Sequence, residues 1–109
     1  MNKIKQIAEE LLNNESAIQI TASGEITEVK PGELENLFTL KELYKYTNCD
    51  IVEFVYLPNE KIMVVDEEGR LRQNPKINLL ASLIVTHLNG GIFSAICGDV
   101  LIINNNQTE

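Results

Sequence analysis

The apolar residues near the start of the chain repeat with the period of an α-helix. They are Ile4, Ile7, Ala8, Leu11 and Leu12. This spacing places them on one face of a helix, and the charged residues between them fall on the other. Asn13 and Asn14 follow, and asparagine tolerates the left-handed conformation that closes helices. The pattern therefore predicts an amphipathic helix over residues 2–14.

Two short runs rich in Ile, Val and Thr come next. They are residues 17–21 and 25–30, and they flank Ala22-Ser23-Gly24, whose glycine suits a turn position with positive φ. We expect a β-hairpin here. Pro31-Gly32 should end its second strand.

A capping box predicts the second helix. In Thr39-Leu40-Lys41-Glu42 the threonine hydroxyl can accept a hydrogen bond from the amide of Glu42, and the carboxylate of Glu42 can accept one from the amide of Thr39. A helix should begin at once, and Asn48 is suited to end it. The residues expected on its buried face are Leu40, Leu43, Tyr44 and Thr47.

The strongest strand pattern lies in the middle of the chain. Residues 51–57 and 61–65 are rich in Ile, Val, Phe and Tyr, and the tight turn Pro58-Asn59-Glu60 separates them. We expect them to pair as the central hairpin of the sheet. The acidic sequence at 66–68 and Gly69 then turn the chain, and Arg70-Leu71 is expected to be extended.

The last third of the chain predicts one more helix and one more strand. Apolar residues recur at helical spacing after Pro75, which suits a first helical turn, and Gly90-Gly91 ends the pattern. Residues 95–103 are apolar at both odd and even positions, except at Gly98-Asp99. This favours a strand buried on both faces, with a bulge or bend at that point.

Together these elements predict an α+β fold with a small mixed, mainly antiparallel sheet and two or three helices. The helices from Leu40 and Pro75 should lie on the face of the central hairpin. Residues 1–15 are expected to form an added, peripheral helix, either a lid or a surface for homodimer formation, whose removal leaves the rest folded. Residues 16–104 should form the single domain and residues 105–109 a disordered tail.

The charge of the chain limits its partners. Its 109 residues include 16 acidic and 9 basic side chains, for a net charge of −7. Affinity for duplex DNA depends on Lys and Arg that neutralise phosphates, so direct duplex binding is not expected. An acidic surface is compatible with simple solubility, with a basic protein partner, or with mimicry of nucleic acid. Charge alone leaves these alternatives open.

Two further features bear on location. Cys49 and Cys97 are far apart and have no second pair, so neither a disulfide framework nor a metal-binding knuckle is expected. No apolar run reaches the ~18 residues of a membrane span. Glu9 and Glu10 stand where a signal peptide would be apolar. We therefore expect a cytoplasmic protein that does not associate with membranes.

Several motifs occur in order along the chain, at residues 24–29, 38–43, 56–69, 78–81 and 98–102. In this order and at this spacing the chain resembles the domain-of-unknown-function family numbered 3846, over residues 17–104. The N-terminal helix lies outside the resemblance. Arg72-Gln73-Asn74-Pro75 also departs from the Leu-Pro-x-Asn that members of the family tend to have.

The family name assigns no chemistry, so the resemblance implies a context. The family is carried by phages, plasmids and integrated mobile elements of bacteria. This gene pool includes small acidic inhibitors of CRISPR nucleases and of other host defences. The resemblance therefore implies an accessory protein of mobile DNA that works in the cytoplasm of a bacterial host cell.

The polar residues of the motifs each have two interpretations. Asp66-Glu67-Glu68 is either a solvated turn or, if functional, a loop that presents negative charge to a basic surface, because consecutive turn residues rarely converge on one metal ion. Asn78 is costly on a helix without a partner, so it either ties the Asp66 loop to the helix or contacts a ligand. Asp99 either caps the bend at Gly98 or contacts a ligand.

The residues needed for catalysis are not recognisable. His87 is the only histidine of the chain, and neither cysteine has a nucleophile motif around it. Gly90-Gly91 is a bare pair, unlike a phosphate-binding loop. We therefore expect no enzyme, with no catalytic residue, no metal ligand and no cofactor.

The leading hypothesis is a non-catalytic interaction protein of a phage or mobile element that inhibits a host defence. It would do so by binding a host protein, for example a nucleic-acid-binding defence protein. The alternative is a small-ligand binder that sequesters a nucleotide signal between the central hairpin and the helix after Pro75, where several basic side chains cluster. Loops at strand ends usually carry binding groups. The expected binding residues are Asp66, Glu67, Glu68, Arg70, Arg72, Asn78 and Asp99.

Overall fold

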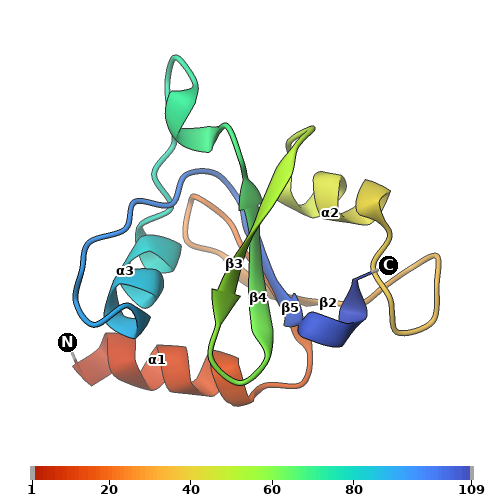
Figure 1. The fold of residues 1–109 in the computed structure, drawn as a ribbon, viewed down its shortest axis with the longest axis horizontal. Helices are drawn as coiled ribbons and strands as arrows, with labels where there is room; N and C mark the ends of the chain where they lie inside the picture. The colour runs from red at the N-terminus through yellow and green to blue at the C-terminus, as the bar shows by residue number, and fades with distance from the viewer. Residues whose placement is uncertain (1, 109) are drawn as a thin grey trace.

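One antiparallel sheet organises the protein, whose computed structural model describes residues 2–108 (Figure 1). The strands lie in the order β2-β1-β5-β4-β3. They are β1 (Ala17–Ile20), β2 (Ile26–Val29), β3 (Val52–Leu57), β4 (Lys61–Asp66) and β5 (Val100–Asn104). The helices are α1 (Asn2–Asn13), α2 (Leu40–Thr47) and α3 (Leu79–Leu88), with short 3-10 turns at Gly69–Leu71 and Asn105–Gln107. The predicted α+β fold and both predicted hairpins are confirmed.

The order of the strands differs from the prediction. Strand β5, the last in sequence, is at the centre and pairs antiparallel with β1 on one side and β4 on the other. The hairpin of β3 and β4 is therefore not central, since β3 is an edge strand, and the sheet is antiparallel throughout rather than mixed. The physical reason is burial. The four apolar residues of β5 are each at most 2% exposed, which an edge strand cannot achieve, whereas Glu53 and Tyr56 of β3 are exposed.

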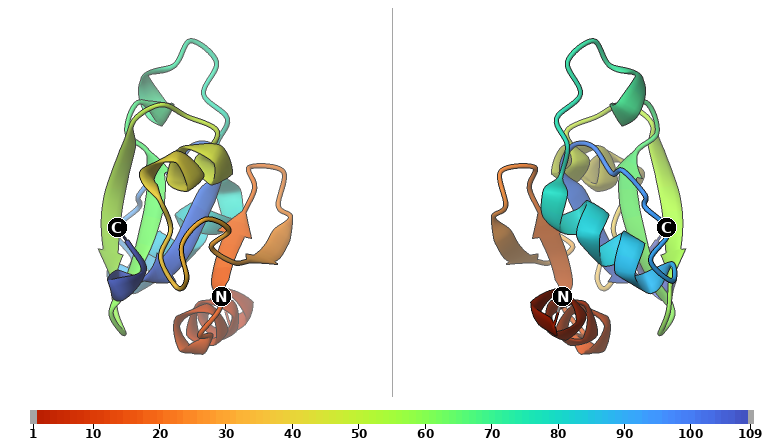
Figure 2. Two further views of the ribbon diagram at one scale, coloured as in Figure 1. Left: turned by 90° about the vertical axis from the view of Figure 1, so that its right-hand side faces the viewer. Right: turned by 90° about the vertical axis from the view of Figure 1, so that its left-hand side faces the viewer.

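The helices cover opposite faces of the sheet (Figure 2). α1 and α3 pack against one face, where side chains such as Ile20, Met63 and Ile102 meet Ala8 and Ile84. Helix α2 packs against the other face, where Phe38 and Leu43 meet the alternate residues of β4 and β5. The helices that follow Leu40 and Pro75 therefore do not share a face, contrary to the prediction. Successive residues of a strand point to opposite faces of the sheet, so each of the two cores contains every second residue of β4 and β5.

Helix α1 is part of the main core. Ala8 is fully buried and Leu11 is 8% exposed. The Nζ atom of Lys61 donates hydrogen bonds to the carbonyl of Asn14 and to Oδ1 of Asn104. A cation at this end of a helix is favourable because the helix dipole is negative there. The helix covers the sheet, as expected of a lid. It is not peripheral, however, because its buried side chains belong to the core. Met1 lies outside the described residues.

Helix α2 has the predicted capping box, and Asn48 ends it in the left-handed conformation with φ 53°. On the predicted buried face, Leu43 and Thr47 are buried and Tyr44 is half-buried. Leu40 is instead 49% exposed, and Glu42 is buried beside Leu43. The reason is that the carboxylate of Glu42 also accepts a hydrogen bond from the amide of Gly32 at 2.7 Å, which turns that side chain inward.

Pairing between distant segments corrects two local predictions, and a local turn after β4 corrects a third. Helix α3 begins at Leu79 rather than at Pro75, because Lys76 and Ile77 pair with the segment before β5. That segment is consequently not part of the strand, which begins at Val100. Arg70 and Leu71 lie in a 3-10 turn rather than an extended segment.

The C-terminal segment also differs from the expected disordered tail. Asn105–Gln107 form a 3-10 turn, and the carbonyl of Gln107 accepts a hydrogen bond from the amide of Phe38 at 2.7 Å. Phe38 is fully buried, so this bond ties the segment to the core on the α2 face. The last residue of the predicted tail, Glu109, lies outside the described residues.

The buried carboxylate of Glu42 generates a prediction about pH. Its hydrogen bond from the amide of Thr39, together with that from Gly32, lowers the pKa of Glu42 below its ordinary value of 4.5. Its contribution to stability is therefore fully present above pH 4.5 and is lost as the pH falls through the lowered pKa. The amide in Glu42→Gln cannot accept all of these bonds, so we expect the variant to be less stable than wild type at pH 7.

The measurement is the free energy of unfolding in urea between pH 7 and pH 3. The difference between wild type and Glu42→Gln should shrink steadily below pH 4.5. Glu35→Gln, at an exposed position of the preceding loop, is the matched control and should track wild type. A difference that stays constant over this range would contradict the role of the carboxylate.

Candidate functional site

Several of the predicted binding residues meet around a cleft of about 420 Å³. The cleft lies where the end of β4, the end of α2, the tip of the first hairpin and the bend before β5 come together. Its lining residues are Ala22, Ser23, Thr47, Asn48, Asp66, Gly69, Arg72, Asn74, Lys76, Gly98 and Asp99. Two carboxylates and two basic side chains therefore share one solvent-open cleft.

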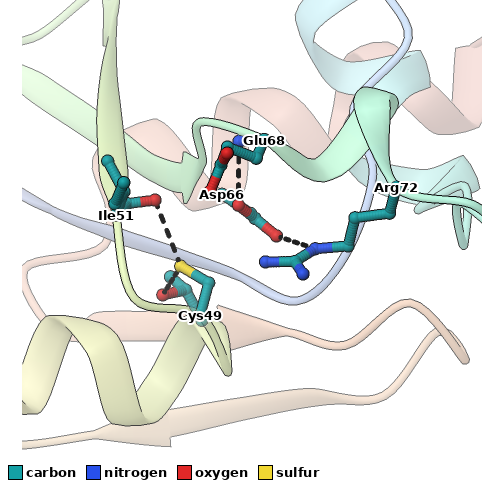
Figure 3. A network of polar contacts seen from close by, with 6 residues as sticks. Cys49, Ile51, Asp66, Glu68 and Arg72 are labelled. Carbon is teal, nitrogen blue, oxygen red and sulfur yellow. Dashed lines mark hydrogen bonds and ion pairs between the residues drawn. The ribbon is translucent and has the colours of Figure 1, made fainter.

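Asp66 and Arg72 form an ion pair at one wall of the cleft (Figure 3). The Nε atom of Arg72 lies 2.7 Å from Oδ2 of Asp66, and the other oxygen of Asp66 accepts a hydrogen bond from the amide of Glu68 at 2.9 Å. The side chain of Asp66 is only 6% exposed, whereas that of Arg72 is 51% exposed. The hydrogen bond from Arg72 to Asp66 raises the pKa of the guanidinium. The carboxylate of Asp66 therefore stabilises the loop that follows it, through Glu68 and Arg72.

The thiol of Cys49 lies near this ion pair (Figure 3). Its sulfur is 3.0 Å from Oγ1 of Thr47 and 3.4 Å from the carbonyl oxygen of Ile51. Burial is the largest effect on this group, and it raises the pKa of the Cys49 thiol. A thiol with a raised pKa is a poor nucleophile at neutral pH, because the thiolate is the reactive form. Cys49 is 9% exposed, so its sulfur packs inside the fold beside these two groups.

Asn78 is fully buried and joins three segments. Its Nδ2 donates hydrogen bonds to the carbonyls of Ile20 and Gly98, both at 2.9 Å, and its Oδ1 accepts one from the amide of Ala81 at 3.1 Å. It is the N-cap of α3 rather than a residue within the helix. These contacts agree with the interpretation that Asn78 ties another segment to the helix. The segments that it joins to α3 are β1 and the bend at Gly98, and not the Asp66 loop.

Asp99 has a similar structural contact. Its Oδ1 accepts a hydrogen bond from the amide of Ala22 at 2.9 Å, so it connects the bend before β5 to the tip of the first hairpin. Gly98 allows the bend, because its φ of 87° lies in the left-handed region that favours glycine. Asp99 and Lys76 both line the cleft.

The remaining predicted residues lie outside this cleft. Glu67 and Arg70 line a second groove of about 220 Å³ between β3, β4, α3 and the segment before β5, and Asp66 borders both spaces. Glu68 is exposed and lines neither of them. The predicted site is thus divided, because Arg72 and Asp99 line the cleft, Glu67 and Arg70 line the second groove, and Asp66 borders both.

A third surface was not predicted from the sequence. A groove of about 430 Å³ separates the tip of the first hairpin from the start of α3, and it is lined by Ala22, Ser23, Gly24, Leu79, Leu80 and Leu83. Leu79 is 64% exposed and Leu83 is 37% exposed. The sequence does contain an indication of this surface. Helix α3 is apolar on nearly all sides, although only one side can face the sheet.

Residues suited to metal binding do not gather in the described part of the chain. Within residues 2–108 no three side chains of His, Cys, Asp or Glu are arranged to hold a metal ion. The single histidine, His87, lies in the last turn of α3 and lines none of the spaces described above. None of the helices described is both long and apolar enough to span a bilayer.

Comparison with known protein families gives a match over most of the chain. A family model described as a domain of unknown function, DUF3846, matches residues 16–109. The match begins just after α1 and includes every strand of the sheet. Neither the curated proteins nor the solved structures contain a match.

The three bonds of Asn78 generate a stability prediction. Asn78→Ala removes a helix cap and the hydrogen bonds that the side chain donates to the carbonyls of Ile20 and Gly98, so we expect a loss of about 3 kcal/mol in the free energy of unfolding. Asn78→Asp keeps the cap but replaces the donor with an oxygen that faces two carbonyls. It should therefore destabilise at least as strongly. Urea denaturation measures both variants.

The matched control is Asn106→Ala, which changes an exposed asparagine and should stay close to wild type. If Asn78→Asp were as stable as wild type, capping of α3 would be the sole role of this side chain. The hydrogen bonds to Ile20 and Gly98 would then contribute nothing measurable to stability.

Proposed function

The chain belongs to the DUF3846 family, a domain of unknown function, and on that premise we propose that it is a non-catalytic interaction protein that binds a protein partner. We further propose that the partner is a host protein with a basic surface, such as a nucleic-acid-binding defence protein. In this proposal the chain acts in the cytoplasm of a bacterial host and serves a phage or mobile element as an inhibitor.

The exposed apolar face of α3 carries this proposal. Leu79 and Leu83 are one helical turn apart, so their side chains lie on the same face of the helix. Both border the groove beside the hairpin tip. Ile77, 55% exposed, precedes them at the start of the helix. Exposed apolar side chains that gather on one surface are typical of protein interaction sites.

The charge of the chain supports a basic partner. Besides Glu67 and Glu68, the exposed residues Asp50 and Glu53 lie at the same end of the hairpin of β3 and β4. The amide of Glu67 bonds to the carbonyl of Ile51 at 3.0 Å, which holds these acidic residues close together. Such a surface attracts a positively charged partner and increases the rate of association.

A specific observation also favours the second candidate, a binder of a small anionic ligand such as a nucleotide. Arg72 and Lys76 line the cleft of about 420 Å³, a volume within the usual range of ligand sites. Against this candidate, Asp66 and Asp99 line the same cleft, and Arg72 is already paired with Asp66. We therefore rank it second.

We predict that Leu79→Asp abolishes partner binding. The substitution places a charge on the proposed contact surface, yet an acidic residue in the first turn of a helix is compatible with the helix dipole. The matched control is Leu40→Asp, since Leu40 is likewise the first residue of its helix, is 49% exposed and lies on the opposite side of the sheet. Affinity capture from host lysate, quantified by mass spectrometry, should enrich the same proteins with wild type and Leu40→Asp only.

The charge of the surface is tested in the same assay. Glu67→Lys with Glu68→Lys should weaken capture, and the effect should decrease as salt rises toward ~1 M, where the Debye length is about 3 Å. Equal capture by wild type, Leu79→Asp and the charge-reversed variant would contradict the proposed function.

The second candidate makes a separate prediction. A nucleotide that binds the cleft should stabilise wild type by about 2.7 kcal/mol when present at ~100 times its dissociation constant. Lys76→Ala should lose this stabilisation, whereas Lys30→Ala, at an exposed position after β2, should keep it. A thermal-shift screen with cyclic and linear nucleotides makes the comparison. If no nucleotide shifts the melting temperature of wild type, this candidate is excluded.

A further inference from the structure

We propose that the groove between the tip of the first hairpin and the first half of α3 receives a basic amphipathic helix of the partner. This inference rests on the proposed function and adds to it the kind of segment that is bound. It follows from the shape of the groove, from the hydrogen bonds of its walls and from the charges around it.

The apolar wall of the groove has helical spacing. Leu79 and Leu83 are four residues apart on α3, and Leu80 completes the lining on this side. The rise of an α-helix separates such residues by ~6 Å along the axis. A partner helix presents its own apolar residues at i and i+4 with the same spacing. Two helices can therefore pack here by placing the side chains of one between those of the other.

The opposite wall is held rigidly by hydrogen bonds. At the hairpin tip the amide of Gly24 donates to the carbonyl of Thr21, and the amide of Thr21 donates to the carbonyl of Glu25, both at 2.9 Å. The amide of Ala22 donates to Asp99 at the same distance. The start of α3 is fixed by Asn78. A groove with two fixed walls loses little conformational entropy on binding, which favours affinity.

These bonds also argue against an extended peptide as the occupant. A peptide that binds as an added strand needs free backbone donors and acceptors along one edge of the groove. Here the amides of Ala22 and Gly24 are already bonded within the protein. The other wall offers apolar side chains of α3. The groove is thus suited to a segment whose own backbone is satisfied internally, as in a helix.

Charge selects a basic helix. Glu25 is exposed next to Gly24, and the carboxylate of Asp99 lies within hydrogen-bond distance of the amide of Ala22. In the neighbouring cleft Asp66 and Arg72 form an ion pair, and the positive charge of Lys76 is matched by the negative charge of Asp99. The exposed carboxylate of Glu25 is left over, so the surroundings of the groove carry a net negative charge. Lys or Arg residues beside the apolar stripe of a partner helix would meet these carboxylates.

A second copy of the chain fits less well. Each copy carries a net charge of −7, so two copies repel one another. Six residues line the groove, fewer than the ~20 or more residues per partner of a stable protein interface. A single inserted helix needs a smaller surface than a dimer does.

The test uses the full chain and a synthetic peptide of fourteen Leu and Lys residues with leucine at helical spacing. Fluorescence anisotropy should show that the peptide binds wild type and Leu40→Asp with the same affinity. Its affinity for Leu79→Asp should be lower by about tenfold or more. The same peptide with Glu in place of Lys should bind at least about tenfold more weakly. Glu25→Lys should weaken binding of the Leu-Lys peptide at low salt, and this effect should decline at high salt.

Three results would overturn the inference. Equal binding of the Leu-Lys peptide to Leu79→Asp would place the peptide elsewhere, and equal binding of the Glu peptide would remove the role of charge. Sedimentation that shows a wild-type dimer and a monomeric Leu79→Asp would make a second copy the occupant. Far-ultraviolet circular dichroism establishes that Leu79→Asp is folded, and Leu79→Ser is the milder second variant.

The failure of this inference can be distinguished from failure of the proposed function. If Leu79→Asp loses the captured host proteins but the Leu-Lys peptide does not bind wild type, the interaction function stands and the helical occupant is wrong. If the peptide binds as expected but capture is unchanged in Leu79→Asp, the groove accepts a basic helix while the proposed partner contact is wrong.

Discussion

Strand β5 joins two hairpins that are otherwise separate. It hydrogen-bonds to β1 on one side and to β4 on the other, and its apolar residues enter both cores. An isolated two-stranded hairpin is at best marginally stable in water. The sheet therefore depends on the insertion of its last strand. The bend at Gly98 precedes that strand, so the cleft beside it also depends on β5 being in place.

The polar residues around the cleft are largely occupied with one another. Asp66 binds Arg72 and the amide of Glu68, Asp99 binds Ala22, and Asn78 binds three segments at once. A buried polar group is costly unless it is paired, so such contacts hold irregular loops in one conformation. Polar residues of the family motifs, such as Asp66, Asn78 and Asp99, can therefore serve to hold the fold together. The apolar side chains of Leu79 and Leu83, in contrast, are left exposed beside the first hairpin.

The N-terminal helix shows how an element outside the family match can still belong to the core. Residues 16–109 match the family model, yet α1 contributes Ala8 and Leu11 to the same cluster as α3. Lys61 of β4 reaches the end of this helix, and burial lowers the pKa of its ammonium group. The cation remains bonded to two oxygens, which offsets part of the cost of burying it.

Elements that depend on nearby residues could be predicted from the sequence. The capping box of Thr39 and Glu42, the turn at Gly24 and the stripe of α1 each rest on contacts within a few residues, and all are present. The order of the strands, the start of α3 and the partners of Asn78 could not be predicted, because each depends on pairing with residues far along the chain. The exposure of Leu79 likewise depends on residues far along the chain. Its hydrophobicity is a local property, but the side of α3 that meets the sheet was decided only by the tertiary structure, through the burial of Ala81, Ile84 and Val85 against β1, β4 and β5.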